Sequence, residues 1–163
     1  MRRKSDSVDA VSESDRPIET AVAAHPFLAG LKPEHLRLLS QNAMRVKYQP
    51  GETIFREGDP ANRFYLIESG SVLLESQSHG ADPIPVQTIG PGNVLGWSWL
   101  FPPYVWHFSA RALQPTTAIF LFGTRLRQDC EENPAFGYEL MSRIAGVVID
   151  RLQETRRMYL AAR

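Results

Sequence analysis

The chain has 163 residues, with 18 Lys and Arg against 18 Asp and Glu, so its formal net charge is zero. That balance excludes a domain that binds nucleic acid through a uniformly basic surface, and an apolar content of 43% excludes a disordered chain. The single cysteine, Cys130, cannot form an intramolecular disulfide. No apolar run approaches the roughly 20 residues of a membrane span. We therefore expect one cytoplasmic domain that does not associate with a membrane.

The first 16 residues are polar, mixed in charge and without apolar periodicity. We interpret residues 1–16 as a disordered tail, with a docking arm as the functional alternative. Residues 17–42 are expected to form helices in pieces, because prolines and a glycine interrupt the segment and leucines recur three residues apart. Pro33 fits the first position of a helix that runs to about Asn42.

From residue 44 to residue 122 the pattern changes to short β-rich runs separated by glycines. Strands at turn-to-turn spacings of roughly 8–12 residues are typical of an all-β sandwich or barrel. The expected strands lie at residues 44–48, 53–55, 64–68, 72–77, 85–89, 106–113 and 117–122. Residues 79–83 are a candidate hairpin tip because they contain a glycine and a proline.

The last part of the chain, residues 125–161, returns to a helical pattern. Residues 125–131 are a short helix candidate, and Asn133 is placed to cap a longer helix in which Pro134 takes the first position. An apolar seam at spacings of three and four residues follows. Because residues 144–149 are apolar nearly all round, we expect one helix face against the barrel and another against a second copy. The sequence thus predicts a homodimer through residues 134–160.

Two motifs within the predicted β segment are specific enough to indicate a protein family. Residues 50–59 read Pro-Gly-Glu-Thr-Ile-Phe-Arg-Glu-Gly-Asp, and residues 64–72 read Phe-Tyr-Leu-Ile-Glu-Ser-Gly-Ser-Val. This pattern resembles the cyclic nucleotide-binding domain family, which provides the sensor domains of catabolite-activator-type regulators, kinase regulatory subunits and gated channels. Over about residues 25–160, the resemblance implies a mainly β fold, an eight-stranded antiparallel β-roll (jelly roll) with N-terminal helices and a long C-terminal helix.

The resemblance also implies a phosphate-binding cassette, here residues 95–112, where the family reads Phe-Gly-Glu-Leu-Ala followed by an Arg-Ala-Ala-Thr-like stretch. Gly96 matches, but Trp97 stands in place of the glutamate that binds the ribose, and Trp106 in place of the arginine that binds the phosphate. Tryptophan offers one N–H donor and no charge. Losing two charged contacts of about 1.5–3 kcal/mol each lowers affinity roughly a hundredfold or more.

The cassette supplies all candidate binding residues, and two interpretations of it stay open. If residues 106–113 form a strand, Trp106, Phe108 and Ala110 share one face, and His107, Ser109 and Arg111 share the other. One interpretation is a pocket of altered specificity for cAMP, cGMP or another small anionic ligand; the other is an aromatic plug. The candidate ligand-binding residues are Gly96, Trp97, Ser98, Trp99, Trp106, His107, Ser109 and Arg111.

Other chemistry finds little support in the sequence. None of the four histidines forms an H-x-H pair with a downstream carboxylate, so no metal site is expected, and no base stands near a candidate nucleophile. Acidic neighbours should raise the pKa of the Cys130 thiol. The chain ends at Arg163, where the long helix should end, so no direct DNA binding is expected. The predicted function is a non-enzymatic sensor that signals through its C-terminal helix; the alternative is a ligand-free interaction and dimerisation module with a protein partner.

Overall fold

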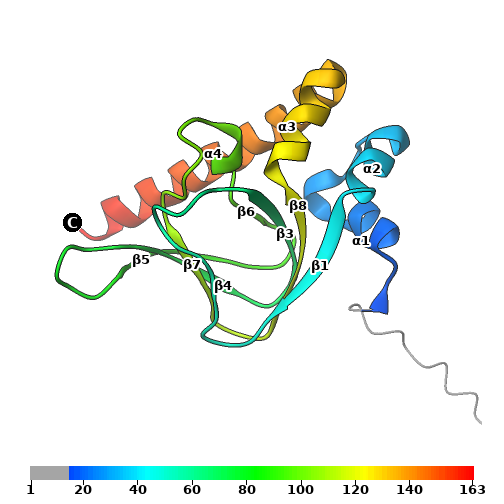
Figure 1. The fold of residues 1–163 in the computed structure, drawn as a ribbon. Coiled ribbons are helices and arrows are strands. Elements are labelled where there is room, and N and C mark those ends of the chain that lie inside the picture. Colours follow the sequence, from blue (N-terminus) through cyan, green and yellow to red (C-terminus); the bar gives the residue numbers. More distant parts are fainter. Residues whose placement is uncertain (1–14) are drawn as a thin grey trace, which may run out of the picture.

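Two four-stranded antiparallel sheets face each other in the computed structural model, which describes residues 15–163 (Figure 1). The first sheet has the order β1 (Ala43–Tyr48), β8 (Thr116–Phe122), β3 (Arg63–Ser69) and β6 (Val94–Leu95). The second has the order β2 (Thr53–Phe55), β7 (Ser109–Ala112), β4 (Val72–Ser76) and β5 (Ile84–Ile89). The predicted eight-stranded antiparallel β-roll is thereby confirmed.

Helices flank the roll at both ends of the described chain (Figure 1). The elements before β1 are α1 (Ile18–Ala24), the 3₁₀ turn η2 (Pro26–Leu28) and α2 (Pro33–Ser40). A second 3₁₀ turn, η3 (Ser98–Leu100), interrupts the strands, and α3 (Gly123–Glu132) and α4 (Pro134–Ala161) follow β8. Asn133 caps α4, its Oδ1 accepting from the backbone N–H of Phe136 at 3.3 Å, as its position before a proline predicts.

The two-residue strand β6 was not among the expected strands. Two further differences from the expected elements have local causes. The expected strand 106–113 is reduced to β7, because the backbone of Trp106 bonds instead to the loop after β2: its N–H donates to Asp59 at 2.9 Å, and its carbonyl accepts from Gly58 at 2.8 Å. The leading helix ends at Ser40, two residues early, because β1 begins at Ala43. The predicted tail lies outside the described residues, except for Asp15 and Arg16.

The apolar residues form two cores that share strand β3. Phe64 and Leu66 face the core between the first sheet and the helices, whereas Tyr65 and Ile67 face the interior of the roll. Successive side chains of a strand point to opposite faces, so the uninterrupted apolar run of β3 reflects burial on both sides. Within residues 15–163, no helix combines the length and the mean hydropathy that crossing a bilayer requires.

Candidate functional site

The interior of the roll is occupied by the indole ring of Trp106. This residue is 4% exposed, and its ring stacks on Phe55 with centroids 3.9 Å apart and planes at 13°. Gly96 makes room for it: a Cβ at Gly96 would lie 2.5 Å from the Trp106 ring, and its φ of +81° also favours glycine. About 40 Å³ of space remains between the ring and Gly96, Trp97 and Ser98, whereas small-molecule pockets hold roughly 300–1,000 Å³. A separate, open depression of about 340 Å³ borders the same ring beside Asp59 and Arg63.

The polar face of the same segment points away from that interior. Arg111 donates to Glu75 of β4 at 2.8 Å, and the Ser109 hydroxyl accepts from the backbone N–H of Glu57 at 3.0 Å. His107 is exposed and lies at the rim of the remaining space. The aromatic face therefore looks inward, and the side chains of Ser109 and Arg111 are bonded elsewhere.

The other two tryptophans serve different parts of the fold. Trp99, in η3, is fully buried on the helix side of the first sheet, where it packs against Phe64 with ring centroids 5.6 Å apart. Ser98 beside it is also buried. Trp97 is half-buried at the rim of the roll, so only Gly96, Trp97, Ser98, Trp106 and His107 of the predicted residues share one site.

Arg151 of α4 joins this site, although it was not among the predicted binding residues. Its guanidinium carbon lies 4.6 Å from the centre of the Trp97 ring, and the same guanidinium donates to the carbonyl of Val94 in β6. Loss of water around the group lowers the pKa of Arg151 to about 10. The one signal in the sequence was a charged residue within the apolar seam of the helix.

A larger, open groove begins at Arg151 and runs between β5 and α4. We call it the β5–α4 groove; its volume is about 610 Å³. One wall is the edge of the second sheet, where consecutive residues from Pro85 to Ile89 line it. The other wall is one face of α4, made by Val147, Asp150, Arg151, Glu154, Arg157 and Met158.

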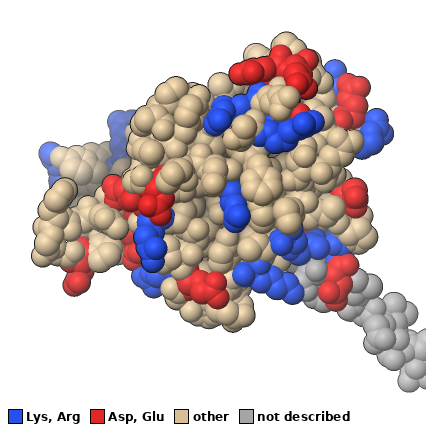
Figure 2. Space-filling view, in the orientation of Figure 1, with Lys and Arg blue, Asp and Glu red and all other residues tan. Residues whose placement is uncertain are grey.

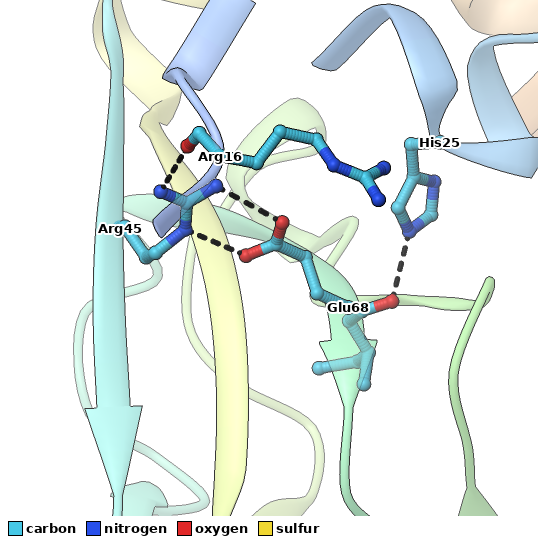
Figure 3. Close-up of polar contacts among 5 residues, drawn as sticks. Arg16, His25, Arg45 and Glu68 are labelled. Carbon is cyan, nitrogen blue, oxygen red and sulfur yellow. Dashed lines mark hydrogen bonds and ion pairs between the residues drawn. The ribbon is translucent and has the colours of Figure 1, made fainter. Parts of the chain in front are cut away.

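Away from both the roll site and the groove, a polar cluster fixes the N-terminal helices to the first sheet (Figure 3). His25 Nε2 donates to the Ile67 carbonyl at 3.0 Å, while its Nδ1 accepts from the N–H of Phe27 at 3.3 Å. Burial lowers the pKa of His25. Arg45 holds both carboxylate oxygens of Glu68, at 2.9 and 3.2 Å, and donates to the Arg16 carbonyl at 2.7 Å. Because these groups satisfy one another, we assign the cluster a structural role.

Residues 45–133 match the model of the cyclic nucleotide-binding domain, which is more than half of the chain. The chain belongs to the cyclic nucleotide-binding domain family. The acetyltransferase Pat of Mycolicibacterium smegmatis is 39% identical over 75 residues, 46% of this chain and 22% of that protein. A CRP-like cAMP-activated global transcriptional regulator of Mycobacterium tuberculosis is 25% identical over 138 residues, 85% of this chain and 60% of the regulator. This chain thus spans less than two thirds of either relative.

Solved structures give the same family. A cyclic nucleotide-binding protein from Geobacter metallireducens is 31% identical, with a TM-score of 0.74 over 82% of this chain and 97% of that one. Thermus thermophilus catabolite activator protein is 27% identical, with a TM-score of 0.66 over 84% of this chain and 63% of that one.

The surface charge is mixed, and the remaining ionisable groups of residues 15–163 form no metal site. Figure 2 shows acidic and basic side chains interspersed among broad neutral areas, with no large patch of one sign on the visible face. Among residues 15–163, no three His, Cys, Asp or Glu side chains gather as a metal site would need. Burial, with the neighbouring Asp129 and Glu131, raises the pKa of Cys130 to about 11, which confirms the predicted direction.

Proposed function

We propose that this chain is a non-enzymatic regulatory domain of the cyclic nucleotide-binding fold whose roll is closed by its own Trp106 and which acts through α4. The observation that carries the proposal is the Trp106 ring, stacked on Phe55 inside the roll. The ring stands where the resemblance places the phosphate-binding arginine, so the domain carries its own occupant.

Energetics argue against a cyclic nucleotide entering this roll in the family's manner. The two charged contacts missing from the cassette lower affinity roughly a hundredfold or more. Expelling a buried tryptophan ring costs about 3–5 kcal/mol, which is a further factor of roughly a hundred to several thousand. The remaining contacts, backbone N–H groups near Gly96 and the Ser98 hydroxyl, are too few to offset both losses.

The contact between Trp97 and Arg151 supports α4 as the output element. A cation over an indole ring contributes about 0.5–2 kcal/mol, with the larger values where water is excluded. The same guanidinium also bonds to Val94, so one α4 side chain holds both the cassette and β6. In this arrangement the cassette and the helix are coupled without a ligand in the roll.

A stripe of exposed apolar side chains supports pairing of α4 with a second copy. Tyr138, Ala145, Leu152 and Tyr159 recur every seven residues, with Met141 and Val148 between them, and all six side chains are exposed. Such spacing is typical of a helix that packs against another helix along its length. We call these six residues the α4 stripe, and we propose that it forms the homodimer interface.

Calorimetry on the whole chain tests the closed roll. Titration with cAMP and with cGMP up to 1 mM should give no saturable heat and no change in tryptophan emission. Saturable binding of either nucleotide within this concentration range would overturn the proposal, because the two losses above together lower affinity by at least about 10⁴-fold.

Sedimentation equilibrium tests the dimer separately. Leu152→Asp places a charge in the α4 stripe and should convert a micromolar dimer to monomer. Leu160→Asp is the matched control, since Leu160 is similarly exposed (56% against 64%) but lies off the stripe. A wild-type monomer, or equal effects of both variants, would contradict the interface.

A further inference from the structure

The guanidinium of Arg151 has lost much of its surrounding water, and within residues 15–163 it has no counter-ion. In the described residues no carboxylate lies within ion-pair distance of it, and it contacts a neutral carbonyl and an indole ring instead. Buried charges in proteins are ordinarily paired, because an isolated one loses much of its hydration free energy. An anion bound beside Arg151 would compensate for this lost hydration free energy.

The β5–α4 groove gives an anion a place to bind at this position. Arg151 lines both the small space in the roll and the groove, so it stands at the boundary between them. The groove volume of about 610 Å³ suits a small organic molecule, whereas the 40 Å³ left between Trp106 and Gly96 does not. Its walls combine apolar side chains, Val86, Val147 and Met158, with the amides of Gln87 and Asn93.

We propose that the β5–α4 groove binds a small organic anion, with a carboxylate or phosphate head on Arg151 and an apolar body along Val86, Val147 and Met158. The site lies outside the roll, and it goes beyond the proposed function because it gives a domain with a closed roll a ligand of its own. The planar guanidinium can bond two oxygens of either head at once.

The remaining charges of the groove define the size and charge of this ligand. Glu154 is neutralised by Arg157, whose guanidinium lies 2.6 Å from its carboxylate. Asp150 lines the groove next to Arg151 and has no ion-pair partner among the described residues. Because the Asp150 carboxylate would repel additional negative charge in the groove, a ligand with a single compact anionic head is favoured over an extended polyanion.

A ligand in this groove would connect the edge strand β5 to the helix that carries the α4 stripe. It would also sit beside the contact between Arg151 and Trp97, so binding should change tryptophan emission. The stabilisation of α4 against the roll would then depend on ligand concentration, as in any two-state element that a ligand favours in one state.

Titration with three probes that share a phenyl ring tests the site: phenylacetate, phenyl phosphate and the neutral 2-phenylethanol. Calorimetry and tryptophan emission excited at 295 nm should report binding of at least one anion, with 2-phenylethanol at least tenfold weaker. Whichever anion binds more tightly identifies the head as carboxylate or phosphate. No binding of either anion below 5 mM, or equal binding of the neutral probe, would overturn the proposal.

Two variants locate the anion. Arg151→Gln should weaken binding of the anions at least tenfold, because it removes the charge and the paired donors. Arg156→Gln, which makes the same change on an exposed residue outside the groove, should leave binding unchanged. If Arg151→Gln does not fold, amide chemical-shift mapping of the wild-type chain replaces it: shifts centred on β5 and α4 support the groove, whereas shifts centred on Gly96 and Phe55 overturn it. The roll itself is judged by the cyclic nucleotide titration, so the two proposals fail separately.

Discussion

Replacing Trp106 with glycine removes the ring that closes the roll. The side chain is almost completely buried and stacked on Phe55, and deleting such a ring destabilises a core by about 3–5 kcal/mol. Loss of the stacking contact is part of that figure, and the added backbone freedom of glycine contributes about 1 kcal/mol more. We therefore expect Trp106→Gly to lower the free energy of unfolding by about 4–6 kcal/mol.

The void left by this change should accept free indole. An engineered apolar cavity of about 150 Å³ binds benzene, and the ring would restore the contacts that the mutation removed. At ten times its Kd, indole should stabilise the variant by RT ln 11, about 1.4 kcal/mol. Urea unfolding with and without indole measures both quantities.

Two matched proteins control this experiment. The wild type, in which the Trp106 ring itself fills this position and leaves about 40 Å³ beside Gly96, should not respond to indole. Trp97→Gly should cost much less, because Trp97 is only half-buried, and indole should not rescue it. A loss below about 1 kcal/mol for Trp106→Gly, or an equal response of the wild type to indole, would refute the assignment of Trp106 as the occupant of the roll.

Three further changes test other parts of the structure. Gly96→Ala should destabilise the chain by about 1–3 kcal/mol in urea unfolding, because its Cβ meets the Trp106 ring and its φ is left-handed; an unchanged midpoint would contradict that contact. Since burial lowers the pKa of His25 from 6.5, the unfolded chain binds the proton more readily. The free energy of unfolding of the wild type should fall by up to about 1.4 kcal/mol for each pH unit below pH 6.5. Urea unfolding at several pH values should show that His25→Gln removes this slope and that the control His79→Gln keeps it. The pKa of native Cys130 is about 11, so little of the thiol is ionised at pH 8. Iodoacetamide should therefore alkylate Cys130 about a hundredfold more slowly in the native chain than in the urea-unfolded chain.

The sequence predicted the fold well because its signals are local. Glycine-bounded β-rich runs identified every strand of residues 15–163 except the two-residue β6. Asn133 followed by Pro134 identified the start of α4, since a cap depends on its own neighbours. The expected strand at 106–113 was too long because Trp106 bonds to the loop near Asp59, a partner far away in sequence. Propensity alone does not contain such a contact.

The orientation of the candidate binding segment could not be predicted from the sequence. The spacing of Trp106 and Arg111 placed them on opposite faces of a strand, and only the packing of the two sheets decides which face is inside. The role of Arg151 depends on where α4 crosses the roll, so the sequence could mark it only as a charge in an apolar seam. Arg111 was selected for its charge, but Glu75 on the adjacent strand pairs with it.

Strand β3 is a wall common to both cores, with Phe64 and Leu66 on one side and Tyr65 and Ile67 on the other. Neither core can lose its packing while the other keeps an intact boundary, because the same backbone supports both. The roll and the helical layer should therefore melt as one cooperative unit. A substitution that changes how the roll is filled, such as one at Trp106, should therefore also lower the stability of the helical layer on the other side of β3.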